Sequence, residues 1–412
     1  MVRNQSGATR RARRGSLRNI HLPVWLGARA LPRPATFVAL FTLAVLPRTL
    51  LITVLPLEAL AFLGSAQKVS VLYLCVSLVG LCGSLSIPWM VHRLRRRWVF
   101  SLGALSMASA ALLFTFQAFP VFVAGMVLHV FAVASLEISL NLYLMDHVPR
   151  RELNRFEPLR VFFAGSAFTL GPWLGVYVRS HLDHGAPFAL TALAALVLFG
   201  YFWFLRLTEN PVVAPMKRPP PKPLVYLPRF FGQPRLRLAW VLAVGRSAWW
   251  SMFFIYAPIY AVTSGLGEIA GGAIVSAGSA CVFLAPLWGR LGRRFGMRRL
   301  LVGGYVAGGL TTMAVAAIAG APWLGAAALL LAAFATGSID GAGNLPFLRA
   351  VHPLERPEMT TVFATYRDAA QLAPPGIFSV LLRFFELPAV FAAGGAALLV
   401  LSYYARFIPR RL

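Results

Sequence analysis

Acidic residues and charged residues in general are scarce in this sequence. Its 412 residues include 13 Asp and Glu against 39 Lys and Arg, and charged residues make up only 13% of the chain. Soluble domains contain about 25% charged residues. Here 58% of the residues are hydrophobic and the mean hydropathy is +0.70. This composition excludes an ordinary soluble domain and predicts an integral membrane protein.

Cysteine is also rare, and the common sequence motifs of nucleotide-binding, zinc-binding and hydrolytic sites are missing. Cys75, Cys82 and Cys281 are scattered through apolar segments, which fits neither a disulfide framework nor a metal site. The chain has no Walker-type phosphate loop, no zinc-ligand spacing and no nucleophile elbow. We therefore expect no enzyme activity, no cofactor, no metal and no transport driven by ATP.

Long apolar runs, by contrast, are frequent, and each is long enough to cross about 30 Å of hydrocarbon as a helix. They lie at 37–57, 69–90, 98–116, 119–144, 159–178, 187–205, 238–262, 269–288, 300–319, 323–347, 361–382 and 387–404. The expected fold is an all-α membrane protein with twelve transmembrane helices. We expect a basic tail (1–34), two six-helix bundles (35–207 and 238–407), a linker between them (208–237) and a short C-terminus (408–412).

The basic residues lie almost entirely on one side of these spans. With the N-terminus inside, 32 of the 39 Lys and Arg fall in inside segments, and only Lys68, Arg179 and Arg383 fall in outside loops. This asymmetry predicts cytoplasmic termini, with a bacterial inner (plasma) membrane as the expected location. It also accounts for the net charge of +26 without nucleic acid as a partner, and the basic tail is expected to contact anionic membrane lipids.

One polar pattern occurs in both halves of the chain. The segment 131–142 carries Glu137 and Asn141, and the segment 334–345 carries Asp340 and Asn344. A spacing of four residues places the acid and the amide on one face of a helix. Because an acid in an apolar helix is costly, each should face the protein interior or a wet cavity.

Other features repeat in the same order. Arg48 follows an L-A-V-L-P sequence in the first span of one half, and Arg246 follows L-A-V-G in the first span of the other. The second span of each half ends in a basic turn, with Arg95 and Arg96 or with Arg293 and Arg294. Since six spans is an even number, the halves are expected to be parallel repeats around a central cavity.

Two motifs then resemble those of the major facilitator superfamily, and the resemblance covers about residues 37–405. The segment 285–294, A-P-L-W-G-R-L-G-R-R, is similar to the family's G-x-x-x-D-R-x-G-R-R signature. It keeps Arg290, Gly292, Arg293 and Arg294 and lacks the Asp. The sequence Gly171-Pro172-x-x-Gly175 is similar to the family's antiporter signature and points to the drug/proton antiporter-like branch.

The resemblance implies which helices line the cavity. In the family these are the first and fourth helices of each half, which here carry Arg48, Glu137, Arg246 and Asp340. All four lie roughly 10 to 17 Å from the cytoplasmic boundary at 1.5 Å per residue. Each Arg can therefore meet the acid of its own half, either as a structural ion pair or as a substrate and proton site.

Further candidates lie on the seventh and eleventh spans. Trp249 and Trp250 are interpreted as packing residues or as an aromatic wall for an amphipathic substrate. Asp368 and Gln371 form a secondary candidate proton site. Arg367, adjacent to Asp368, is expected to contact the cytoplasmic basic loops or to extend toward the membrane–water interface.

These observations favour a monomeric secondary transporter that exports a small organic solute with proton coupling. Two alternatives stay open: uptake or uniport of a small organic anion held by Arg48 or Arg246, and a membrane sensor or assembly partner that transports nothing. Asp340 is the favoured proton carrier at this level, because Gly341 and Gly343 beside it are expected to leave room for water.

The topology can be tested with single cysteines in a background that lacks the three native ones. Ala8→Cys, Pro220→Cys and Leu412→Cys should react only from the cytoplasm, and Ala66→Cys and His184→Cys only from outside, because the basic residues concentrate on one side. The measurement is labelling of intact cells with a membrane-impermeant thiol reagent. Labelling of Pro220→Cys from outside would contradict the topology.

Overall fold

The computed structural model of the chain describes residues 34–147, 153–205, 223–318, 320–352 and 355–408. These residues form helices joined by short turns, and none of them belongs to a strand. Residues 1–33 of the basic tail, the first half of the linker (208–222) and the positions Ala8, Pro220 and Leu412 lie outside the described residues.

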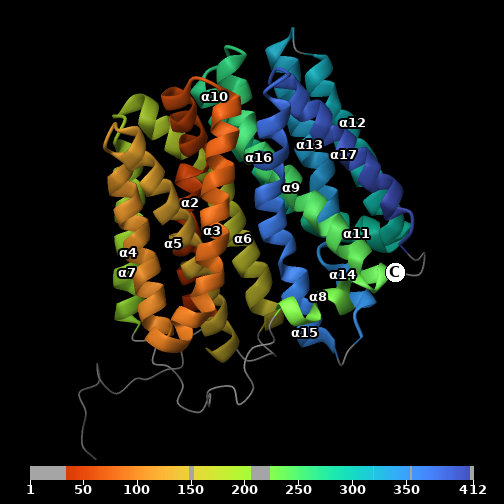
Figure 1. The fold of residues 1–412 in the computed structure, drawn as a ribbon, viewed down its shortest axis with the longest axis horizontal. Coiled ribbons are helices and arrows are strands. Elements are labelled where there is room, and N and C mark those ends of the chain that lie inside the picture. Colours follow the sequence, from red (N-terminus) through yellow and green to blue (C-terminus); the bar gives the residue numbers. More distant parts are fainter. Residues whose placement is uncertain (1–33, 148–152, 206–222, 319, 353–354, 409–412) are drawn as a thin grey trace, which may run out of the picture.

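The N-terminal half is a bundle of six long helices, drawn in red to yellow-green in Figure 1. They are α2 (Pro34–Leu63), α3 (Ala66–Leu94), α4 (Arg96–Phe114), α5 (Phe119–His147), α6 (Leu153–His181) and α7 (Ala186–Phe204). Each begins and ends within a few residues of an expected apolar run, except that α2 and α6 extend further into their flanks.

The C-terminal half repeats this order with more interruptions. A short helix, α8 (Pro223–Phe231), precedes α9 (Pro234–Thr263). The remaining spans are α10 (Glu268–Ala280) continued by a 3₁₀ turn (Cys281–Leu284) and α11 (Ala285–Phe295), α12 (Met297–Ala317), α13 (Pro322–Ala342) with α14 (Leu345–Ala350), α15 (Arg356–Ala364) with α16 (Tyr366–Leu381), and α17 (Pro388–Ala405).

Eleven helices in the described part of the chain are long and apolar enough to cross a membrane. The expected span that is not among them is the eleventh, 361–382, which is divided between α15 and α16 at Thr365. Arg367, Asp368 and Gln371 lie in the first two turns of α16, so the apolar part of this span is short. The twelve-helix layout predicted from the sequence is thereby confirmed.

The bundle has two ends that the site description needs. At one end, here called the linker end, α8 packs against α15, and Arg229 forms an ion pair with Glu355. At the opposite end, here called the far end, α2 turns into α3 and α9 turns into α10 (Figure 1). The expected linker is therefore not hydrophilic throughout, because Phe230 of α8 is fully buried in a cluster with Phe363 of α15.

The two halves meet through a reciprocal pattern of contacts. The fifth helix of the N-terminal half, α6, packs on α10, and the fifth span of the C-terminal half, α16, packs on α3. The first helices of the halves, α2 and α9, also contact each other. Reciprocal pairing of span five with span two indicates parallel repeats related by an axis along the bundle.

Glycines of α6 allow that helix to approach α2 closely. A Cβ atom at Gly175 would overlap the Leu50 carbonyl oxygen, and a Cβ at Gly171 would lie 2.5 Å from Thr49 Oγ1. Small residues at such crossings give backbone packing that lipid cannot replace. The two glycines of the G-P-x-x-G sequence thus have a definite packing role.

Gly175→Val should therefore destabilise the protein, because its side chain would collide with backbone that cannot move aside. We expect a loss of about 1–3 kcal/mol, as for other overpacked sites, seen as a lower melting temperature in detergent. The matched control is Gly200→Val on α7, where a Cβ meets no atom within 4 Å. Equal melting temperatures for the two variants would contradict the packing role.

Candidate solute and proton site

Glu137 of α5 links the two halves of the bundle. Its Oε2 lies 3.6 Å from Nη1 of Arg48, which is on α2 of the same half. Its Oε1 accepts a hydrogen bond of 3.0 Å from Nη1 of Arg367, which is on α16 of the other half. One carboxylate is thus shared by two guanidinium groups, one within its own half and one across the interface.

The contact of Arg367 corrects the sequence analysis, which expected this residue to contact the basic loops or to extend toward the membrane–water interface. Its place in the first turn of α16 instead directs it between the halves. The exposed fraction of the side chain is 59% for Arg367 and 42% for Glu137. Since charged groups at this depth are placed against water or protein and not lipid, water reaches the space between the halves here.

The C-terminal half holds the second charged group, formed by Asp340 and its neighbours. Asp340 Oδ1 lies 3.3 Å from Nε of Arg246, and Oδ2 accepts a hydrogen bond of 2.6 Å from Nε1 of Trp250. Arg246 and Trp250 are both on α9. Both carboxylate oxygens of Asp340 therefore have partners within their own half, in contrast to those of Glu137.

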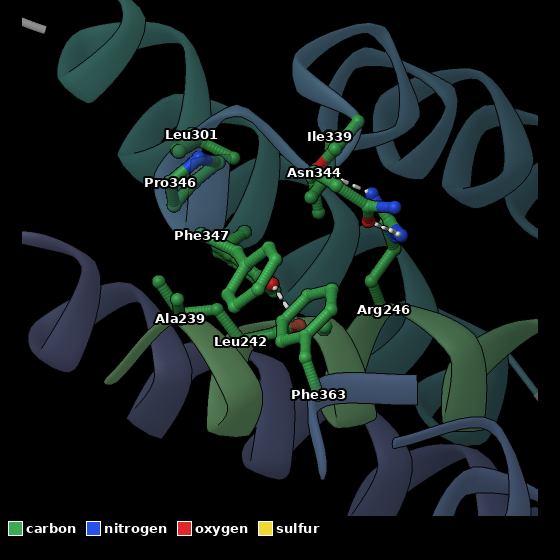
Figure 2. A pocket seen from close by; sticks show the side chains of 12 residues that line it. Ala239, Leu242, Arg246, Leu301, Ile339, Asn344, Pro346, Phe347 and Phe363 are labelled. Atoms are coloured by element: carbon green, nitrogen blue, oxygen red, sulfur yellow. Dashed lines mark hydrogen bonds between the residues drawn. The ribbon is translucent and has the colours of Figure 1, made fainter. Parts of the chain in front are cut away.

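The remaining donors of Arg246 bind where α13 ends. Figure 2 shows the guanidinium beside Asn344, where Nη2 donates to Asn344 Oδ1 at 3.3 Å and Nη1 donates to the Gly343 carbonyl at 2.8 Å. A cavity of about 10 Å³ lies behind these groups, next to the stacked rings of Phe347 and Phe363. It has room for about one water molecule.

The helix break explains two differences from the sequence analysis. α13 ends at Ala342, and Gly343 has φ +53°, a left-handed value that favours glycine. Asn344 is therefore not one helical turn from Asp340 on a continuous helix. Gly341 leaves no room for water either, because a Cβ there would overlap the side chain of Trp288.

The first half lacks this break. α5 continues past Glu137 and Asn141 to His147, so the acid and the amide do lie one turn apart there. Within the described residues, no side-chain hydrogen bond of Asn141 is recorded. The shared pattern of acid and Asn thus gives two different local structures.

A row of aromatic rings lies between the two charged groups. The Arg48 guanidinium stands over the ring of Phe168, 5.0 Å from its centroid. The Phe168 ring faces that of Phe254 at 6.1 Å across the halves, and Phe254 stacks on Trp250 at 5.6 Å. Phe168 of α6 was missed by sequence reasoning, because an isolated Phe in an apolar helix carries no signal of its own.

The two tryptophans have different roles. Trp250 is partly exposed and binds Asp340, as described above. Trp249 is 3% exposed, and its Nε1 donates to Thr312 of α12 inside the C-terminal half. Of the two interpretations of Trp249, packing residue or aromatic wall, the structure supports packing, and this residue belongs to the core.

The other candidates on α16 and in the basic turns have no recorded side-chain hydrogen bond or ion pair to the site among the described residues, although Asp368 interacts electrostatically with Arg367 and Glu137. Asp368 is partly exposed and Gln371 is exposed, and the structure records no hydrogen bond for either among the described residues. Arg290, Arg293 and Arg294 are exposed on α11, Arg95 and Arg96 lie at the turn between α3 and α4, and Gly292 packs against Met297 and Leu300. A gating role for these turns stays a prediction.

The far end carries a charged cluster that the sequence analysis did not identify. Arg179 of α6 lies 2.8 Å from Glu58 of α2 and 2.9 Å from Glu268, which begins α10 of the other half. Glu58 is also 3.4 Å from Nδ1 of His184, and its side chain is only 4% exposed. The expected span 37–57 ended one residue before Glu58, and Arg179 was counted only as a loop charge.

A backbone contact closes the halves nearby. The N–H of Trp173, which directly follows Pro172 in α6, donates to Ser276 Oγ on α10 at 2.9 Å. Together with the Arg179–Glu268 pair, this joins α6 to α10 at the far end. Arg367 and Glu137, which pair across the halves, are exposed. The far end, by contrast, is closed across the interface by direct contacts.

Two parallel six-helix bundles with paired charges between them define a transport protein with a duplicated fold. The chain belongs to the major facilitator superfamily, whose family model matches residues 37–375. No curated protein matches the sequence. The family and its structural neighbours identify a transporter and not an enzyme.

Solved structures of low sequence identity share this fold. A POT family transporter in complex with 5-aminolevulinic acid aligns with a TM-score of 0.73 at 11% identity, over 90% of this chain and 94% of that one. A POT family transporter in complex with a thioalcohol conjugated peptide aligns with a TM-score of 0.72 at 11% identity, also over 90% of this chain and 94% of that one. The nucleoside transporter NupG aligns with a TM-score of 0.71 at 14% identity, over 90% of this chain and 98% of that one.

Arg179→Ala should open the far end more often, because it removes the cross-half pair and leaves the buried Glu58 without its guanidinium partner. The measurement is the rate at which a thiol reagent supplied at the far side labels Phe168→Cys, expected to rise about tenfold if the closed state loses about 1.4 kcal/mol. The control is Arg383→Ala. Arg383 is an exposed arginine at the far end for which no ion pair with a described residue is recorded. Equal rates in the two variants would contradict closure by this cluster.

Proposed function

We propose that this chain is a proton-coupled secondary transporter that moves a small organic solute by alternating access. The observation that supports it best is the Glu137 carboxylate, which is shared between Arg48 of its own half and Arg367 of the other. A group bound across the interface is affected directly when one half rocks against the other. Such a difference between states is what coupling requires.

The proposed solute is amphipathic and carries an anionic group. Arg48 and Arg367 each present a planar fork of donors that suits a carboxylate. Phe168, Phe254 and Trp250 offer ring faces between the two charged groups, where the apolar part of the solute can pack. A carboxylate of the solute would then compete with Glu137 for the same guanidinium groups.

We propose Glu137 as the proton carrier, in place of Asp340. The partners of Asp340, Arg246 and Trp250, lie in its own half and move with it. The sequence favoured Asp340 because both Gly341 and Gly343 were expected to leave room for water. The space beside Gly341 is filled by Trp288, whereas Gly343 lines a cavity with room for about one water molecule. Protonation of Glu137 would remove the charge that holds Arg367, so the proton and the solute would both act on one contact.

The sidedness and direction belong to the same proposal. We infer that the linker end is cytoplasmic, in a bacterial inner membrane, because the basic residues concentrate on that side. We infer export because Gly171-Pro172-x-x-Gly175 is similar to the antiporter signature, and a packing role for its glycines is compatible with that motif. The transporter is proposed to work as a monomer.

The proposal is tested by a solute screen in proteoliposomes with an imposed pH gradient, read by a pH-sensitive dye inside the vesicles. A solute that is exported with proton exchange should cause proton flux in one direction only. Movement of an organic anion without proton flux would favour uptake or uniport. Absence of any solute-dependent flux across the screen would favour a sensor or assembly partner.

Glu137→Gln is expected to abolish accumulation driven by the pH gradient and to keep exchange of solute at equal pH. The amide keeps an acceptor for Arg48 and Arg367 and cannot carry the proton. The measurement is uptake of the radiolabelled solute found in the screen, with and without the gradient.

Asp340→Asn is the matched comparison for this experiment. If Glu137 carries the proton, Asp340→Asn keeps the response to the gradient, although its affinity for the solute can fall through the loss of the ion pair with Arg246. Gradient-driven accumulation that survives in Glu137→Gln and disappears in Asp340→Asn would assign the proton to Asp340 instead.

A further inference from the structure

A groove on the outer surface of the C-terminal half lies apart from the proposed solute site. It has a volume of about 470 Å³ and is formed by α11, α12 and α13. The halves are joined elsewhere, by α6 with α10 and by α3 with α16. The groove therefore faces the surroundings of the bundle and not the space between the halves.

The walls of the groove are apolar and its floor is open. Phe295 of α11 and Phe334 of α13 flank it with exposed fractions of 51% and 42%. Along its floor on α12, a Cβ at Gly303 would meet no atom within 4 Å. From Arg299 to Ala307, both of which line the groove, α12 rises about 12 Å. This shape suits an extended hydrocarbon chain.

One end of the groove is strongly basic. Arg299 lines the groove itself. Around the turn between α11 and α12 lie four further arginines, Arg290, Arg293, Arg294 and Arg298. The sequence from 269 to 339 contains no acid, and none of the five arginines has an ion pair recorded with a residue that the structure describes. This end therefore offers unneutralised positive charge to a ligand.

We propose that the groove binds an anionic glycerophospholipid, with its phosphate at Arg299 and the basic turn and one acyl chain along Gly303. A basic cluster beside a transmembrane helix attracts anionic lipid to the membrane surface next to it. A second copy of this chain is a poorer occupant, because a two-fold contact would bring one basic face against another. The lipid supplies both the negative charge and the apolar chain that the two ends of the groove require.

This site gives the signature-like segment 285–294 a role of its own. Arg290, Arg293 and Arg294 resemble the family signature, but its Asp is replaced by Gly289, so these arginines lack the acidic partner that the signature contains. In this chain the lipid phosphate takes the place of that partner. The turn is then neutralised by the membrane and not by the protein.

The test uses the full chain purified in detergent, with phosphatidylglycerol and phosphatidylcholine of identical acyl chains as probes. Native mass spectrometry gives the affinity of each lipid. We expect phosphatidylglycerol to bind the unaltered chain at least about tenfold more tightly than phosphatidylcholine, which corresponds to about 1.4 kcal/mol. Equal affinities would overturn the proposal.

Two variants separate the headgroup from the acyl chain. Arg299→Ala should reduce the preference for phosphatidylglycerol, and Gly303→Phe, which fills the groove, should weaken both lipids by about tenfold. Arg235→Ala, an exposed arginine of the same half, and Gly200→Phe, an open exposed glycine on α7, are the matched controls and should change neither affinity. If Gly303→Phe does not elute as a single species, Ala307→Leu fills the same groove.

The outcomes that overturn the proposal are distinct. Retention of phosphatidylglycerol by the groove-filling variant would show that only the basic surface attracts lipid. A loss caused equally by Gly200→Phe, or by Arg235→Ala, would show that no particular groove or arginine is involved.

Discussion

The cost of placing charge away from water governs how this bundle is built. A charged side chain within a membrane helix needs a partner or access to water, and an ion pair left with one member is strongly destabilising. The charges described here meet this requirement in three ways. Asp340 and Arg246 are enclosed by partners of one half, Glu137 is shared across the halves beside water, and Glu58 is covered at the far end by Arg179 and His184.

The charged groups of the two halves differ in how firmly they are held. The C-terminal group is held by four contacts of Arg246 and Trp250, all made by residues of that half. The N-terminal group is more open and depends on Arg367 from the other half. A duplicated sequence pattern has thus produced one group suited to keep its shape and one suited to respond when the interface changes. The aromatic rings of Phe168, Phe254 and Trp250 lie between the two groups, in the region proposed above for the solute.

The overall fold could be predicted from the sequence, because hydrocarbon thickness and the positive-inside asymmetry are constraints that each helix expresses locally. The pairing of Arg48 with Glu137 and of Arg246 with Asp340 was also predictable, since depth follows from position along a helix. The predictions that failed depended on the direction of a side chain around its helix or on a break in a helix. Arg367 turned inward, and Gly343 ended a helix that the apolar run suggested would continue. The choice between packing and an aromatic wall for Trp249 also depended on rotation, and the structure resolves it as packing. Neither the direction of a side chain around a helix nor a contact between distant helices is written in local composition, which is also why Phe168 and the Glu58 cluster were missed.

The hydrogen bond between the Trp173 amide and Ser276 restricts the residue type at one of its two positions far more than at the other. The donor is a backbone group, so every residue type except proline supplies it at position 173, whatever the side chain does. The acceptor is a hydroxyl oxygen, so position 276 tolerates few residue types. This link between the halves therefore restricts the residue type at position 276, which must supply the acceptor. It places almost no restriction on the side chain at position 173.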